Sequence, residues 1–180
     1  TFSAVQLRQR GFVVEDDQGW TEYRVPGLNV LLSDGFIEDH CFRVSRRRDH
    51  GMVGIEFEPT RARRNLPEIA GTIWLDRPTS ALRRMEFRYV NITREQEGEA
   101  GGELVFGRLA DGGWAISRWH IRMPVLEQQT LGGRTMVRLA EIRTVGGDLT
   151  LAAAGTDTLW LAAAGRSLLT VIAGRVVSDS

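Results

Sequence analysis

Apolar and polar residues alternate along most of the chain from Cys41 onward. In residues 53–57, Val53, Ile55 and Phe57 take one side, and residues 82–90 repeat the pattern with charged residues between apolar ones. A period of two predicts strands with one buried and one solvent-facing side. Similar runs predict further strands at residues 41–47, 69–76, 103–109, 114–123 and 135–145.

The connections between these runs are short and have turn composition. Residues 76–81 (DRPTSA) and 110–113 (ADGG) each separate two alternating runs, and an Asp-Gly pair is a strong hairpin signal. Strands joined by short turns form antiparallel meanders, whereas parallel strands need crossover helices. We therefore predict a mainly β fold, or an α+β variant of it: a curved antiparallel meander of about six to eight strands.

Short helical segments are expected before this sheet. Ser3 is a plausible N-cap for a helix that ends at Gly11, and Ser33 is a plausible cap for a second short helix. Residues 20–25 (WTEYRV) predict a short strand. These N-terminal helices are expected to cover part of one face of the sheet.

Loop and domain boundaries follow from composition. Residues 60–67, with three arginines, and residues 93–102, acidic and glycine-rich, are expected to be solvated loops. The chain becomes alanine-rich after Gly146. We expect an antiparallel β domain at residues 1–145, a β-prone extension or linker at 146–166, and the truncated start of another β module at 167–180.

Charge and hydropathy exclude two classes of protein. The 180 residues carry 23 basic and 23 acidic groups, so the net charge is zero and the basic excess of a nucleic-acid-binding protein is absent. No run approaches the ~20 apolar residues of a membrane-spanning helix. All basic residues are arginine, which we attribute to GC-rich codon usage because alanine and glycine are also abundant.

Motifs for catalysis or cofactor binding are missing from the sequence. There is no HExxH, CxxC or GxSxG motif, and a P-loop is impossible without lysine. We expect no enzymatic activity, no cofactor and no metal site. The alternative is a metal-dependent or cysteine hydrolase centred on His40, Cys41 and His50, although alternation directs His40 and Cys41 to opposite faces of a strand.

Two clusters of side chains are candidates for binding. The arginine groups 46–48, 61–64 and 83–84 could form an anion or lipid-headgroup patch, but interleaved glutamates favour cross-strand ion pairs. Aromatic residues on the strands could line an apolar pocket, or serve only as core. The candidate ligand-binding residues are Phe57, Trp74, Phe87, Tyr89 and Trp119.

Several motifs between Val30 and Pro124 carry a resemblance to a known group of proteins. They are NVLLSDGFIEDHCFRV, GIEFEP, EIAGTIWLD, LRRMEFRYVNI, GGELVF and GWAISRWHIRMP. They resemble uncharacterised bacterial proteins that contain a carboxypeptidase regulatory-like domain, and the tail TVIAGRVVSDS resembles the first strand of that β-sandwich module. The resemblance implies an exported segment of a larger protein, periplasmic or outer-membrane-associated, without a peptidase centre.

A weaker resemblance concerns the architecture. Leu75, Asp76, Thr79 and Leu82 form a pattern similar to that of periplasmic lipoprotein-carrier proteins, which hold acyl chains inside a curved sheet. We therefore expect a non-catalytic binding or structural module of an envelope protein, whose partner is a lipid, another apolar ligand or an envelope protein. A protein–protein interaction scaffold is a further alternative, expected to expose an apolar patch or an open sheet edge.

Overall fold

The structure is a computed structural model that describes residues 3–15, 17, 21–131, 134–154, 157–161, 170–172 and 175–177. The helices are α1 (Ala4–Arg10), α2 (Leu28–Leu31), α3 (Asp34–Asp39) and the 3-10 helix η1 (Arg61–Arg63). The strands of the main sheet are β3 (His40–Val44), β4 (Met52–Pro59), β5 (Glu68–Asp76), β6 (Leu82–Val90), β7 (Gly101–Arg108), β8 (Trp114–Leu131) and β9 (Arg134–Asp148). The smaller strands are β1 (Val13–Glu15), β2 (Thr21–Tyr23), β10 (Leu151–Ala154), β11 (Asp157–Leu161), β12 (Thr170–Ile172) and β13 (Arg175–Val177).

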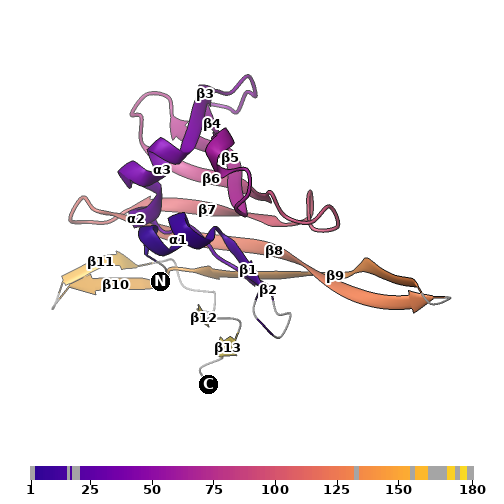
Figure 1. Ribbon diagram of the computed structural model, residues 1–180. Coiled ribbons are helices and arrows are strands. Elements are labelled where there is room, and N and C mark those ends of the chain that lie inside the picture. Colours follow the sequence, from indigo (N-terminus) through magenta and orange to yellow (C-terminus); the bar gives the residue numbers. More distant parts are fainter. Residues whose placement is uncertain are drawn as a thin grey trace.

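The main sheet is a seven-stranded antiparallel meander in which every strand pairs with its sequence neighbour, in the order β3-β4-β5-β6-β7-β8-β9. The strand directions rotate steadily from β3 to β9 (Figure 1), as the right-handed twist of strands requires. The prediction of a mainly β, antiparallel fold with few short helices is confirmed. No helix among the described residues has the length and apolarity to cross a membrane.

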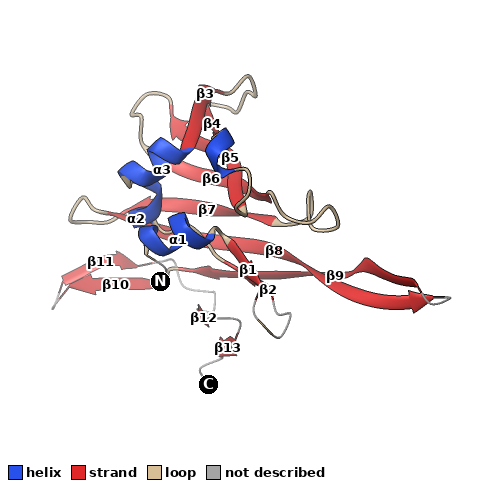
Figure 2. Cartoon of the chain, viewed as in Figure 1, coloured by secondary structure: helices blue, strands red, loops and turns tan. Residues whose placement is uncertain are grey.

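One face of the sheet carries the core and is covered by the N-terminal helices (Figure 2). Across the strands, Phe57, Gly71, Phe87, Gly102 and Ile121 stand opposite one another in one row. A Cβ atom at either glycine would collide with the backbone of the next strand, at Glu86 or at His120. The buried core is made of Leu7, Phe12, Val13, Val30, Phe36, Phe57, Ile69, Met85, Phe87, Tyr89, Ala100, Leu104, Phe106 and Ile121.

The helix ends lie where the sequence predicts them. The Ser3 hydroxyl accepts a hydrogen bond from the Gln6 N–H at 3.2 Å, and the Gln6 side chain accepts one from the Ser3 N–H at 3.1 Å. Gly11 ends α1 with a φ of 78°, a conformation that favours glycine. The Ser33 hydroxyl accepts from the Phe36 N–H, which confirms the predicted start of α3.

The opposite face of the sheet is polar and carries cross-strand ion pairs. Arg43 on β3 contacts Glu56 on β4 at 2.6 Å, and Arg84 on β6 contacts Glu103 on β7 at 3.3 Å, in addition to Glu86 of its own strand at 2.7 Å. These pairs confirm that the charged residues of neighbouring strands meet on one wet face. Trp74 lies on this face, yet its exposed fraction is only 1%.

The two predicted solvated loops are exposed at about half of their positions. In the loop after β4, the Arg63 side chain is 11% exposed and reaches Glu68 at the start of β5. In the loop before β7, Gln96 and Ala100 are both buried. The expectation of solvated loops therefore holds for the exposed positions and is wrong for Gln96 and Ala100, which are buried.

Strands β8 and β9 extend past the rest of the sheet as a two-stranded arm. From Met123 onward β8 pairs only with β9, so both strands are longer than their alternating patterns predict. The arm exposes apolar side chains on β9, namely Met136, Val137, Leu139 and Ile142. Beyond β9, β10 pairs with β11 and β12 with β13. Trp20 and most of residues 162–180 lie outside the described residues.

Candidate ligand-binding pocket

The predicted ligand-binding residues divide between the two faces of the sheet. Phe57, Phe87 and Tyr89 are buried in the core under the helices, and Trp119 packs against the same core while half-buried. Trp74 lies on the opposite face, between the guanidinium groups of Arg47 and Arg84, whose central carbons are 5.4 Å and 5.3 Å from its ring centre. None of the five lines the pocket found beside α1.

The structure does not bring the residues of the hydrolase alternative together. His40 is buried, Cys41 is exposed at the next position of β3, and His50 is exposed in the turn after β3. Within the described part of the chain, no group of three or more histidine, cysteine or acidic side chains could hold a metal ion.

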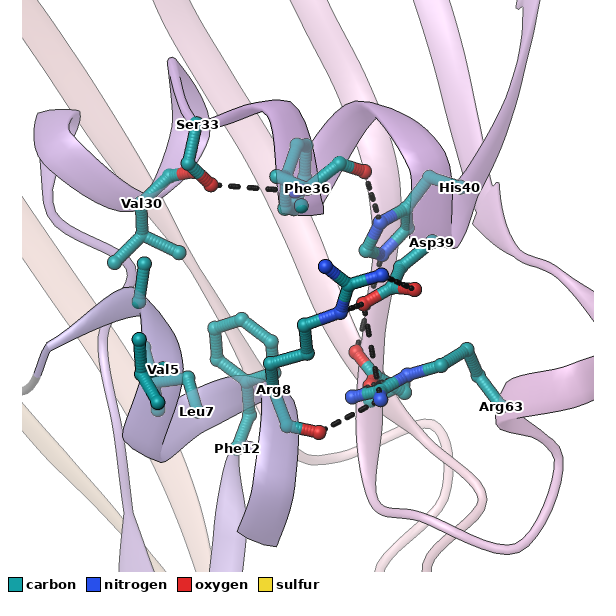
Figure 3. Close-up of a pocket in the computed structure, with 13 residues that line it drawn as sticks. Val5, Leu7, Arg8, Phe12, Val30, Ser33, Phe36, Asp39, His40 and Arg63 are labelled. Atoms are coloured by element: carbon teal, nitrogen blue, oxygen red, sulfur yellow. Dashed lines mark hydrogen bonds and ion pairs between the residues drawn. The ribbon is translucent and has the colours of Figure 1, made fainter.

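A pocket of about 230 Å³ opens between α1, α3 and the beginning of β5 (Figure 3). Its location follows from the sequence: α1 and α3 are each a short, capped helix, and each buries one large apolar residue, Leu7 and Phe36. The space that remains between α1 and α3 is the pocket. The apolar wall consists of Ala4, Val5, Leu7, Phe12, Val30 and Phe36.

Charged residues from four elements form the polar end of the pocket. The Arg63 Nε donates to Glu68 Oε1 at 2.7 Å, and Arg63 Nη1 donates to the Arg8 carbonyl oxygen at 2.7 Å. Arg8 Nε lies 3.1 Å from Asp39 Oδ2, and Arg8 also contacts Glu38 at 2.9 Å. These contacts join α1, α3, η1 and β5 at one end of the sheet.

His40 is held between two backbone carbonyl groups. Its Nδ1 lies 2.8 Å from the Phe36 oxygen, and its Nε2 lies 3.2 Å from the Ile69 oxygen. The ring also stacks against Phe36, with centroids 4.1 Å apart. Burial lowers the pKa of His40 below its ordinary value, although the two carbonyl groups oppose that effect. The neutral imidazole therefore has one N–H to donate to these two oxygens.

Glu68 supplies a buried acceptor that the protein leaves unused. Its exposed fraction is 1%, and its Oε2 has no hydrogen-bond partner among the described residues. His40 Nε2 is 3.9 Å from this oxygen, too far for a hydrogen bond. Burial raises the pKa of Glu68, whereas the Arg63 guanidinium acts in the opposite direction. An unpaired buried carboxylate oxygen is energetically costly, so a hydrogen-bond donor that reached it would be stabilising.

Sequence reasoning missed Arg8 and Glu68 at this polar end, and it noticed Arg63 only as a member of a group of arginines. They are distant in the sequence: Arg8 and its contact Arg63 are 55 positions apart. The only local signal is the spacing of Arg63 and Glu68 on either side of Pro67, which brings the chain into β5. That spacing fits no known ligand or catalytic motif.

We expect His40 to make the stability of the fold fall as the pH drops from about 7.5 to about 5.5. Because the folded pKa lies below the ordinary value of 6.5, the unfolded chain takes up a proton first, and stability present above pH 6.5 is lost below it. Glu68, Asp39, Arg63 and Arg8 surround the ring. Urea midpoints at the two pH values should differ less for His40→Gln than for the wild type.

His50→Gln is the matched control for this prediction. His50 is exposed in the turn after β3, so its loss should leave the wild-type pH dependence unchanged. Equal pH dependence of the wild type and His40→Gln would show that His40 is not held neutral by the fold.

The chain matches no protein-family model, no curated protein and no solved structure. The case for a function therefore comes from the geometry of the pocket.

Proposed function

We propose that this chain is a non-catalytic binding module of an exported bacterial envelope protein, and that it binds a small amphiphilic molecule in the pocket between α1, α3 and β5. The observation that carries the proposal is the unpartnered Oε2 of Glu68, buried at the polar end of an apolar-walled pocket. The inner face of the sheet, which holds acyl chains in the lipoprotein-carrier proteins that the architecture resembles, is covered by the helices in this chain.

The dimensions of the pocket limit the apolar part of the ligand. An engineered cavity of about 150 Å³ lined by aliphatic and aromatic side chains binds benzene. The volume of about 230 Å³ is therefore enough for a body the size of a phenyl ring and a short chain. It is small compared with pockets for drug-sized ligands, which span ~300–1,000 Å³. A full-length acyl chain does not fit.

The charges at the polar end define the head group. Glu68, Asp39 and Glu38 are three carboxylates, and Arg8 and Arg63 are the two guanidinium groups that pair with them. With His40 neutral, this cluster has one more negative charge than positive. A primary ammonium group would donate to Glu68 Oε2 and balance the charge, whereas a carboxylate would meet an unpaired negative oxygen.

A matched set of three probes tests the proposal by calorimetric titration. 2-Phenylethylamine, 2-phenylethanol and phenylacetate share the aromatic body and differ in the head group. We expect the amine to bind most tightly, the alcohol about tenfold more weakly, and the carboxylate not at all, since a charge-assisted hydrogen bond contributes ~1.5–3 kcal/mol.

Two tryptophan variants provide the structural control. Val5 lines the pocket and is 64% exposed, so Val5→Trp should fold and occupy the space near the mouth. Ile37 is 57% exposed on α3 and does not line the pocket, so Ile37→Trp adds the same side chain elsewhere. We expect Val5→Trp to lose binding of 2-phenylethylamine and Ile37→Trp to keep it. Equal binding by both variants, or no binding of any probe, would refute the proposal.

The envelope location rests on the resemblance of residues 30–124 and stays a prediction. The scaffold alternative is supported by a different observation: β9 is an edge strand of the sheet and exposes Met136, Val137, Leu139 and Ile142. That surface and the pocket lie on separate elements, so an interaction role for the arm is compatible with ligand binding.

A further inference from the structure

Four arginines from two turns line a second hollow, at the hairpin that joins β3 to β4. The turn at residues 45–51 joins β3 to β4 and supplies Arg46, Arg47 and Arg48, while Arg77 comes from the turn between β5 and β6. His50 and Asp49 complete the charged and titratable lining of this hollow, whose volume is about 860 Å³. We call this site the basic hollow.

Backbone and side-chain contacts hold the two turns together. The Arg77 N–H donates to the Gly51 carbonyl oxygen at 2.8 Å, which ties one turn to the other. The Arg47 N–H donates to the Ser45 hydroxyl at 3.1 Å. Arg84 on β6 contacts Asp49 at 2.5 Å, so the middle of the first turn is fixed to the polar face of the sheet. These contacts fix the two turns of the basic hollow to each other and to the sheet.

Only part of the charge in the basic hollow is neutralised. Arg47 pairs with Glu86 at 2.9 Å and covers Trp74, and Asp49, the acidic residue of the lining, is engaged by Arg84. Among the residues that the structure describes, Arg46, Arg48 and Arg77 make no ion pair. Three arginines without an ion-pair partner among the described residues thus line one hollow, in a chain whose net charge is zero.

We propose that the basic hollow binds a ligand that carries phosphate groups. Guanidinium groups donate two parallel hydrogen bonds to phosphate oxygens, so three of them suit an anion with more than one negative charge. Mutual repulsion between uncompensated cations is relieved when such an anion binds. The same chemistry is offered by the headgroup of an anionic phospholipid and by a soluble phosphate ester.

Two measurements distinguish a phospholipid headgroup from a soluble phosphate ester as the ligand. Calorimetric titration with pyrophosphate detects a soluble anion, and co-sedimentation with phosphatidylglycerol vesicles, compared with phosphatidylcholine vesicles, detects a lipid headgroup. The triple variant R46A/R48A/R77A removes the unpaired guanidinium groups. R61A/R64A/R94A removes the same number of exposed arginines elsewhere and is the matched control.

We expect the wild type to bind pyrophosphate, anionic vesicles or both, and the R46A/R48A/R77A variant to lose at least about tenfold in affinity. The R61A/R64A/R94A variant should stay within about twofold of the wild type. Binding only to vesicles would assign the site to a lipid headgroup, and binding only to pyrophosphate to a soluble ligand. No saturable binding to either probe, or equal losses in the two triple variants, would overturn the proposal.

Discussion

Arg63→Ala is expected to lower the free energy of unfolding at pH 7 by about 3–5 kcal/mol, because it leaves the charge of Glu68 buried without its ion-pair partner. The side chains are 11% and 1% exposed, so water does not replace the lost guanidinium. The Arg63 contact to the Arg8 carbonyl oxygen is lost as well. Urea unfolding followed by tryptophan fluorescence measures the change.

Two further variants distinguish the loss of the ion pair from a general effect of mutating this loop. Arg64 is exposed beside Arg63, and Arg64→Ala should change stability by no more than about 0.5 kcal/mol. Adding Glu68→Gln to Arg63→Ala removes the uncompensated charge, so the double variant should be more stable than Arg63→Ala alone. If Arg63→Ala were as stable as Arg64→Ala, the Arg63–Glu68 pair would not join η1 to β5.

Gly71→Val should cost about 3 kcal/mol or more, because it pushes strands β5 and β6 apart. A Cβ atom at this position would overlap the Glu86 carbonyl oxygen and lie 2.8 Å from the Phe87 Cα. Both are backbone atoms that cannot move without breaking the pairing in the middle of the sheet. Thermal unfolding should show a large drop in Tm.

Gly51→Ala is the control for this substitution. A Cβ atom there has no neighbour within 4 Å, so the only penalty is the positive φ of 72°, about 1–2 kcal/mol. Equal Tm values for Gly71→Val and Gly51→Ala would contradict the close approach of β5 and β6 at Gly71.

Local patterns were enough to predict most of the fold. The strand at residues 82–90 has the predicted bounds because a period of two at residues 84–89 stands between two segments of turn composition. Helix α1 begins and ends as predicted because a capping serine and a glycine mark its limits. The arm of β8 and β9 was underestimated because residues 127–130 (EQQT) have no apolar member, and a strand exposed on both faces shows no alternation.

The candidate sites depend on contacts that no local pattern encodes. His40 was singled out as a titratable residue, but its neighbours Arg63 and Glu68 arrive from η1 and β5 through the folding of the sheet. Alternation correctly separated His40 from Cys41. The basic hollow includes Arg46–Arg48, already noticed as a cluster, but Arg77 joins them only because two turns of the meander lie side by side.

The most direct test of the central claim is a ¹H–¹⁵N NMR titration of the chain with 2-phenylethylamine. If the ligand binds between α1, α3 and β5, saturable shifts should appear at the amides of Ala4, Val5, Phe36 and Glu68, and Val5→Trp should abolish them. Shifts confined to other parts of the chain, or shifts at these amides that persist in Val5→Trp, would contradict a ligand site in this pocket.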